Sequence, residues 1–152
     1  MILKDDYFFL SNFYPCTVVL DIEGRKVIFH NVECAYQAQK NYNLAERFCL
    51  LKPLEAKKYG KVIPVTTPYW DRYKLIAMAK ALHSKFCNIE LLHKLKSVKE
   101  EIINDNYWGD KFWGVYKGKG KNILGKMLMI IRDSNNNLLE LIEYITNMSN
   151  ED

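Results

Sequence analysis

A single β-hairpin signal near the start of the chain, followed mainly by helical patterns, limits the fold more than any other feature of this sequence. Residues 16–31, CTVVLDIEGRKVIFHN, contain two β-branched runs on either side of Glu23-Gly24. Such runs around a short turn predict two antiparallel strands. The sequence therefore predicts an α+β fold that is mostly helical and has one small β-sheet.

Capping residues and apolar periodicity predict where the helices lie. Asn31 is expected to cap a helix that runs from Val32 to about Leu50. Pro53 is expected to open a short helix that Gly60 ends. Further helices are expected over residues 69–87, after Asn88, from Asn122, and from the Asn135–Asn137 turn to about Met148. Residues 98–103 fit either a strand or a helix end, and residues 105–121 fit a structured loop.

Length and composition predict one soluble domain. The chain has 152 residues, 49% of them hydrophobic, which is enough for one packed core over residues 1–152. We expect no membrane span, because no apolar run approaches about 18 residues. The first residues lack the pattern of a secretory signal, so we expect a cytoplasmic protein. The four cysteines and three histidines have no metal-ligand spacing, so we expect free thiols and no metal.

The net charge of +4 is mild. It suits a small anionic substrate, whereas proteins that bind nucleic acid usually concentrate more positive charge. The one dense basic cluster is KGKGK at residues 117–121, which a solvated loop explains equally well.

A polar stripe on the helix after Asn31 is the first candidate for chemistry. Glu33, Gln37 and Lys40 are spaced i, i+4, i+7, so they are expected on one helix face. Such a stripe is usually the solvated side of an amphipathic helix. Because the residues beside this stripe on the helix are apolar, however, the polar face is narrow. A narrow polar face between apolar residues fits the border of a cleft.

Three other segments carry weaker signals. Trp70, Lys74 and Met78 also have helical spacing, but a core position explains the Trp and the Met better. Trp108, beside Gly109, fits either a stacking platform for a heterocycle or a packed loop. The glycines of GKGKNILG at residues 118–125 would let backbone N–H groups approach a phosphate at a helix start, although the order of a P-loop is missing.

The order of these segments along the chain resembles one protein family. The segments are FLSNFYP (9–15), NVECAYQAQK (31–40), Trp70 with Lys74 and Met78, Lys85-Phe86, E-x-x-x-x-D-x-x-WG (100–109) and G-x-N-x-LG-x-x-LM-x-x-R (120–132). Together they are similar to the NADAR superfamily, the YbiA-like N-glycosidases, over most of the chain. The chain departs from the family in its extra aromatics Phe112, Trp113 and Tyr116, which put the identity of the substrate in doubt.

The resemblance implies a hydrolase that cleaves the bond between ribose C1 and an aminated heterocycle, without a cofactor. One branch of the family acts on ribosylaminopyrimidine 5′-phosphates of early riboflavin biosynthesis. Another branch removes ADP-ribose from guanine in DNA or RNA, so ADP-ribosylated nucleic acid is an alternative partner. A module that binds ADP-ribose or NAD without turnover is a third possibility. The sequence does not indicate the oligomeric state.

The family pattern and the chemistry of ribosylamines together predict the roles of individual residues. Lys40 is expected to attack C1 and form a Schiff base, with Glu33 moving protons. Asp105 is assigned to the ribose hydroxyls or to assisting water. The rival mechanism is an oxocarbenium ion stabilised by Glu33 or Asp105. The remaining substrate-binding candidates are Asn12, Gln37, Trp108, Gly109, Gly118, Lys119, Gly120 and Asn122. Of these, Asn12 is assigned to the sugar, Trp108 to the base, and the 118–122 loop, with Lys119 or Lys121, to the phosphate.

Overall fold

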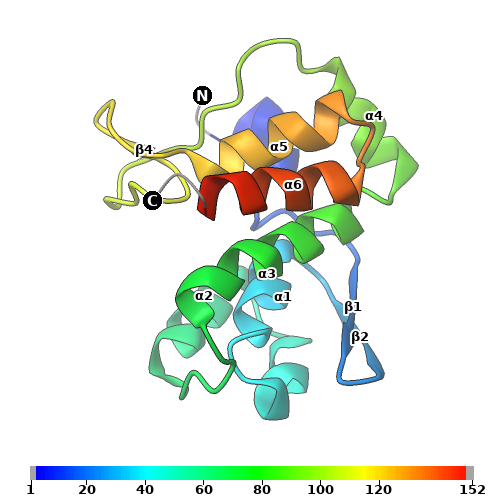
Figure 1. The fold of residues 1–152 in the computed structure, drawn as a ribbon, viewed down its shortest axis with the longest axis vertical. Helices are drawn as coiled ribbons and strands as arrows, with labels where there is room; N and C mark the ends of the chain where they lie inside the picture. The colour runs from blue at the N-terminus through cyan, green and yellow to red at the C-terminus, as the bar shows by residue number, and fades with distance from the viewer. Residues whose placement is uncertain (1–2, 150–152) are drawn as a thin grey trace.

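The computed structural model describes residues 3–149 and has the expected α+β architecture (Figure 1). Helix α3 crosses the middle of the molecule, with the β1–β2 hairpin, α1 and α2 on one side of it and α4, α5 and α6 on the other (Figure 1). The elements in chain order are η1 (Asp5–Leu10), β1 (Val18–Ile22), β2 (Arg25–Phe29), α1 (Val32–Ala38), η2 (Tyr42–Phe48), α2 (Pro53–Val62), α3 (Trp70–Lys85), α4 (Ile89–Ser97), β3 (Asp105–Asn106), β4 (Val115–Tyr116), α5 (Ile123–Asp133) and α6 (Leu138–Ser149).

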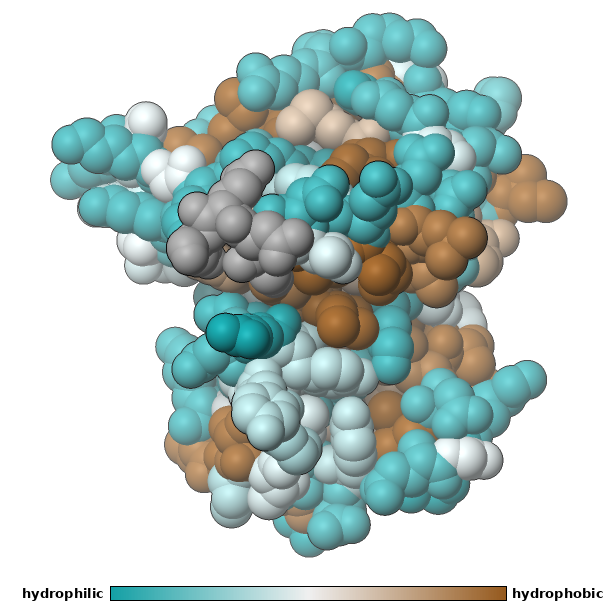
Figure 2. All heavy atoms as spheres, in the orientation of Figure 1, coloured by the Kyte–Doolittle hydropathy of each residue, from teal (hydrophilic) through white to brown (hydrophobic). Residues whose placement is uncertain are grey.

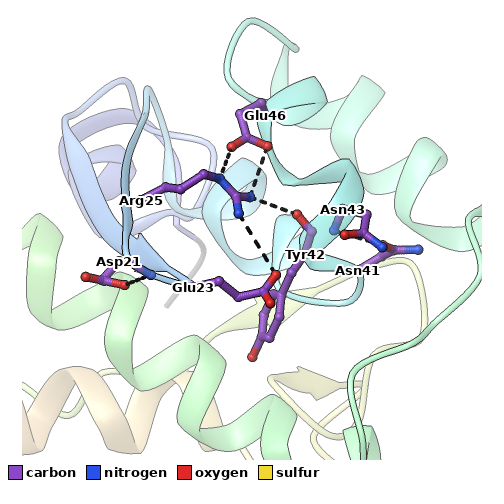
Figure 3. Close-up of polar contacts among 8 residues, drawn as sticks. Asp21, Glu23, Arg25, Asn41, Tyr42, Asn43 and Glu46 are labelled. Carbon is purple, nitrogen blue, oxygen red and sulfur yellow. Dashed lines mark hydrogen bonds and ion pairs between the residues drawn. The ribbon is translucent and has the colours of Figure 1, made fainter.

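The predicted hairpin is confirmed. Strands β1 and β2 are antiparallel, and Val18 pairs with Phe29 at their open end. The apolar side chains of one face are buried, as alternation along a half-buried strand requires. Arg25 fastens the hairpin to η2, because its Nε donates to Glu46 Oε1 at 2.6 Å and its Nη2 to the Tyr42 carbonyl at 3.1 Å (Figure 3).

The prediction of one helix from Val32 to Leu50 is wrong. Helix α1 ends at Ala38, and a separate 3-10 helix, η2, begins at Tyr42. The chain turns because the Lys40 carbonyl accepts from the backbone N–H groups of Thr66 at 3.0 Å and Thr67 at 3.1 Å, instead of from the next helical turn. Asn41 is then extended, with φ −153°. Lys40 therefore lies beyond α1, not on its face.

Helix α2 also differs from its prediction. It continues past Gly60 to Val62, so this glycine does not end the helix. Gly60 is buried, and a Cβ atom there would overlap the side-chain amide of Gln37. The glycine thus permits close packing of α1 on α2. By contrast, the helix starts at Asn31 and Asn88 are confirmed, because each asparagine side chain accepts a backbone N–H of the first turn.

The hydrophobic core joins the two sides of α3. Its largest fully buried side chains are Phe29, Phe48, Phe86, Leu10, Met78, Leu82, Leu95, Ile102, Ile123, Met127 and Leu128. Hydrophobic side chains also gather on the drawn face where α6 meets α3, between otherwise hydrophilic surfaces (Figure 2). Within residues 3–149, no helix has the length and apolar character that crossing a bilayer requires.

The segment between α4 and α5 is irregular and closely hydrogen-bonded. Residues 98–103 form neither the strand nor the helix end that was predicted. The following loop contains a short parallel pair, in which Asp105 lies opposite Val115. Asn106 holds the loop by donating to the carbonyls of Asp110 at 2.7 Å and Val115 at 3.0 Å. The predicted structured loop is thus confirmed, with two very short strands within it.

The start of α5 leaves no room for a larger residue at Gly125. A Cβ atom there would overlap the Asn122 amide and the Ile102 carbonyl. We expect Gly125→Ala to lower the free energy of unfolding by about 1–3 kcal/mol through overpacking, despite the better helix propensity of alanine. Urea unfolding measures this change. Lys126→Ala, at the exposed neighbouring position, is the control and should stay within about 0.5 kcal/mol of the parent. Equal stability of the two variants would contradict the prediction.

Candidate active site

Glu33 is a buried carboxyl group in the first turn of α1. Only 8% of the residue is exposed, and every residue of α1 is buried, so this helix has no solvated face. Burial raises the pKa of Glu33, and the hydrogen bond that its Oε1 accepts from Gln37 Nε2 at 2.9 Å partly opposes the increase. A carboxyl group held in this way can retain or accept a proton at a higher pH than an exposed glutamate.

Lys40 lies near Glu33 although it is outside the helix. Its Nζ donates to the Gly60 carbonyl at 3.0 Å and is half-buried against α2. Burial lowers the pKa of Lys40, and the positive charge of Lys61 lowers it further, whereas Glu33 raises it. The predicted common helix face is thus wrong in its geometry. The charges of the Lys40 amine and the Glu33 carboxyl group nevertheless act on each other.

Two buried amide oxygens beside this pair accept no hydrogen bond within residues 3–149. They are Asn12 Oδ1 and Gln37 Oε1, both assigned to substrate binding from the sequence. Asn12 is next to Glu33, because its carbonyl accepts the Glu33 N–H at 3.1 Å. Buried acceptors without donors are costly. Gln37 Oε1 packs against Gly60, whereas Asn12 Oδ1 is suited to a hydroxyl or amine of a ligand.

A buried lysine fixes the backbone just before Asn12. The fully buried Lys85 donates from Nζ to the Ser11 carbonyl at 3.0 Å. Burial lowers the pKa of Lys85 to about 8.

Trp108 contacts helix α2 as well as its own loop. Its side chain is partly exposed, and Lys57 Nζ lies 4.8 Å from its ring centroid. The charges that act on Glu33 are those of Lys57 and Lys40, which lower its pKa, and of Asp110, which raises it. The sequence did not single out Lys57 or Asp110. Asp110 directly follows the Trp108-Gly109 pair, whereas nothing in the sequence distinguishes Lys57 from the other lysines of α2.

An aromatic wall packs on the other flank of Glu33. Tyr36 lies against Trp70 with ring centroids 5.5 Å apart, and edge-on to Trp113 at 5.6 Å. Phe112 packs edge-on to Trp113 at 4.8 Å. Phe112 and Trp113, which depart from the family pattern, therefore contribute to this wall. Trp70 is half-buried and is part of the wall, whereas Met78 is in the core, as predicted.

The predicted phosphate loop at residues 118–122 leads into a helix start whose first N–H groups already have acceptors. The N–H groups of Asn122, Ile123 and Leu124, at the start of α5, donate to the carbonyls of Gly114, Phe112 and Trp113. Both side-chain amide atoms of Asn122 are also occupied, by Asn104 N–H at 2.8 Å and the Ile102 carbonyl at 2.9 Å. These three N–H groups at the helix start are thus already used, and Asn122 is a structural residue here.

The other loop candidates take various positions. Gly118 and Lys119 lie at the exposed tip of a tight turn, in which Lys119 and Tyr116 exchange backbone hydrogen bonds at 2.8 and 3.1 Å. Gly120 and Gly109 have positive φ angles of 144° and 91°. Asp105 lies in β3, and the carboxylate that acts on Glu33 from this loop is that of Asp110.

A hollow of about 420 Å³ lies outside these residues. It is lined from β1, η2, α3 and the start of α6 by residues that include Asp21, Tyr42, Tyr73, Lys80 and His83. It contains none of the residues predicted from the sequence to be in the site. The cluster around Glu33 and Lys40 is therefore identified by its buried charges and unpaired amide oxygens, not by this hollow.

Comparison with known proteins identifies relatives of the chain. It is 29% identical over 140 residues to a riboflavin biosynthesis protein of Vibrio vulnificus, a match that covers 85% of this chain and 36% of that protein. It is 36% identical over 74 residues to an N-glycosidase of Nostoc punctiforme, which covers 47% of each chain. It is 31% identical over 140 residues to the N-glycosidase YbiA of Shigella boydii, covering 86% of this chain and 82% of YbiA. The chain thus spans about a third to a half of the first two relatives.

The fold and the family model agree with these relatives. The solution structure of Escherichia coli YbiA superposes with a TM-score of 0.72 at 28% identity, covering 89% of this chain and 83% of that one. The model of the NADAR domain matches residues 3–134, which include the whole cluster around Glu33 and Lys40. The chain therefore belongs to the NADAR domain family.

Proposed function

We propose that this chain is an N-glycosidase that hydrolyses the bond between ribose C1 and the amine of a heterocycle. The observation that carries the proposal is the coupling of a buried carboxyl group with a half-buried amine that bonds to the adjoining helix α2, since burial raises the pKa of Glu33 and lowers that of Lys40. Groups perturbed in this way are typical of catalytic sites. The names of two relatives, both N-glycosidases, support the same reaction.

In the proposed reaction, Lys40 replaces the base at C1. The ribosyl ring opens to an imine between C1 and the nitrogen of the base, and the neutral Lys40 amine adds to C1. Glu33, protonated at the start, gives its proton to the imine nitrogen as Lys40 adds, and then takes a proton from the Lys40 nitrogen. Glu33 passes this second proton to the same base nitrogen, so the base leaves as an amine and a protonated Schiff base remains beside the ionised Glu33. Water then adds to C1, the Lys40 amine leaves, and the sugar closes again as ribose. The unpaired oxygen of Asn12 is suited to accept from a sugar hydroxyl.

The proposed substrate is a small phosphorylated ribosylamine. One relative is named a riboflavin biosynthesis protein, which supports a ribosylaminopyrimidine phosphate, and the net charge of +4 suits such an anion. A second candidate is ADP-ribosylated guanine in nucleic acid. It is favoured by the exposure of Tyr107 at 85% beside the partly exposed Trp108, because exposed aromatic side chains can stack on extruded bases.

Borohydride trapping tests the covalent step. We expect reduction during turnover of a ribosylaminopyrimidine 5′-phosphate to leave a ribityl phosphate adduct on Lys40, identified by peptide mass spectrometry. Lys40→Met should form no adduct and release no base, and Glu33→Gln should lower kcat by about 10²- to 10⁴-fold through loss of acid–base catalysis. Lys58→Ala, at an exposed position of α2, is the control. Base release without an adduct on Lys40 would favour the oxocarbenium path. Binding without base release would favour a binding module.

The two pKa shifts predict a bell-shaped pH profile. The reaction requires one proton on the Lys40–Glu33 pair, so kcat/KM should fall at low pH when Glu33 also protonates, and at high pH when Lys40 loses its proton. The raised pKa of Glu33 moves the acid limb to higher pH, and the lowered pKa of Lys40 moves the alkaline limb to lower pH. Together the two shifts narrow the pH range in which the enzyme is active. Lys61→Ala removes a charge that lowers the pKa of Lys40, so its alkaline limb should move to higher pH. An unchanged alkaline limb would argue against Lys40 as the titrating group.

A further inference from the structure

We propose that Lys57 binds the 5′-phosphate of the substrate and thereby makes the enzyme selective for phosphorylated ribosides. This inference rests on the proposed function, because it assigns the anion site of the same reaction. It replaces the loop at residues 118–122, where the backbone donors at the start of α5 are already bonded to carbonyls.

Lys57 lies at the junction of α2 and the Trp108 loop. Its ammonium group is 4.8 Å from the centroid of the Trp108 ring, and its charge acts on Glu33 more strongly than that of Lys40 does. Lys57 is one helical turn before Gly60, whose carbonyl accepts from Lys40. The ammonium is therefore close to both the predicted base platform and the proposed reacting pair, as a group that binds the far end of one ribose must be.

Among the described residues, the ammonium of Lys57 forms no ion pair. Within residues 3–149 no carboxylate oxygen lies within 4.0 Å of Lys57 Nζ, and its described contact is the indole face. The residue is half-buried, so water screens its charge less than that of an exposed lysine. A phosphate would give this ammonium charge-assisted hydrogen bonds, which are stronger than a cation–π contact. The exchange would also free the face of Trp108 for the heterocycle.

Neighbouring lysines are less suited to this role. Lys58 and Lys61 are exposed on α2. Lys74 and Lys121 face the ring of Phe112, at 4.2 and 5.9 Å from its centroid, and neither is among the charges that act on Glu33. Among the described lysines other than Lys40, Lys57 is thus the one whose positive charge lowers the pKa of Glu33.

The experiment compares two probes, ribose 5-phosphate and ribose, which differ only in the phosphate. Each open-chain aldehyde can form a Schiff base with Lys40, and borohydride reduction followed by peptide mapping gives the half-saturating sugar concentration. We expect the parent protein to require less ribose 5-phosphate than ribose. Lys57→Ala should raise the half-saturating concentration of ribose 5-phosphate about tenfold, the effect of losing one charge-assisted contact, and leave that of ribose unchanged. Lys57→Arg should retain the preference, and Lys58→Ala is the matched control.

Two results would overturn the role of Lys57. A preference for phosphate that persists in Lys57→Ala would place the phosphate elsewhere. Equal losses for both sugars would mean that Lys57 only positions Trp108. Calorimetric titration with ribose 5-phosphate measures the same contact without a covalent step. If no adduct forms in the parent protein, the Schiff-base function fails, but weaker binding of ribose 5-phosphate by Lys57→Ala would still support the phosphate site. Unchanged binding would refute it.

Discussion

The site depends on the complete burial of a seven-residue helix that carries a carboxyl group. Helix α1 is covered by its neighbours along its whole length, so Glu33 is removed from water although no ion pair neutralises it within the described residues. Desolvation then disfavours the charged form of both Glu33 and the adjacent Lys40. The rest of the site follows from this burial, because Gly60, Asn12 and Gln37 all pack directly against the helix or belong to it.

Local sequence signals predicted the fold well where a single residue controls the backbone. The Asn31 and Asn88 caps and the Glu23-Gly24 turn were predicted correctly, since each depends on a short-range hydrogen bond or a left-handed turn. The end of α1 was not predicted. It depends on Thr66 and Thr67, which are distant in sequence and take the Lys40 carbonyl out of the helix. Patterns over a few neighbouring residues contain no information about such a contact.

The grouping of the candidate residues around Glu33 was predicted only in part, for a similar reason. The sequence selected Glu33, Gln37 and Lys40 from helical spacing, and the structure brings them together although Lys40 is outside the helix. It did not select Lys57 or Asp110, whose relation to Glu33 exists only after α2 and the Trp108 loop have packed. The glycines at residues 118–120 suggested an anion site, but the carbonyls of Gly114, Phe112 and Trp113 use the donors at the start of α5.

The loop between β3 and α5 is secured at its base and open at its tip. The side-chain amides of Asn106 and Asn122 hydrogen-bond to its two ends. Gly114 is packed so closely that a Cβ atom there would collide with the Asn104 carbonyl. By contrast, Tyr107 and Trp108 are exposed. Residues at the tip can therefore be exchanged without disturbing α1 or the anchoring asparagines. The tip is thus a segment whose surface can change in evolution while the buried helix and its carboxyl group stay in place.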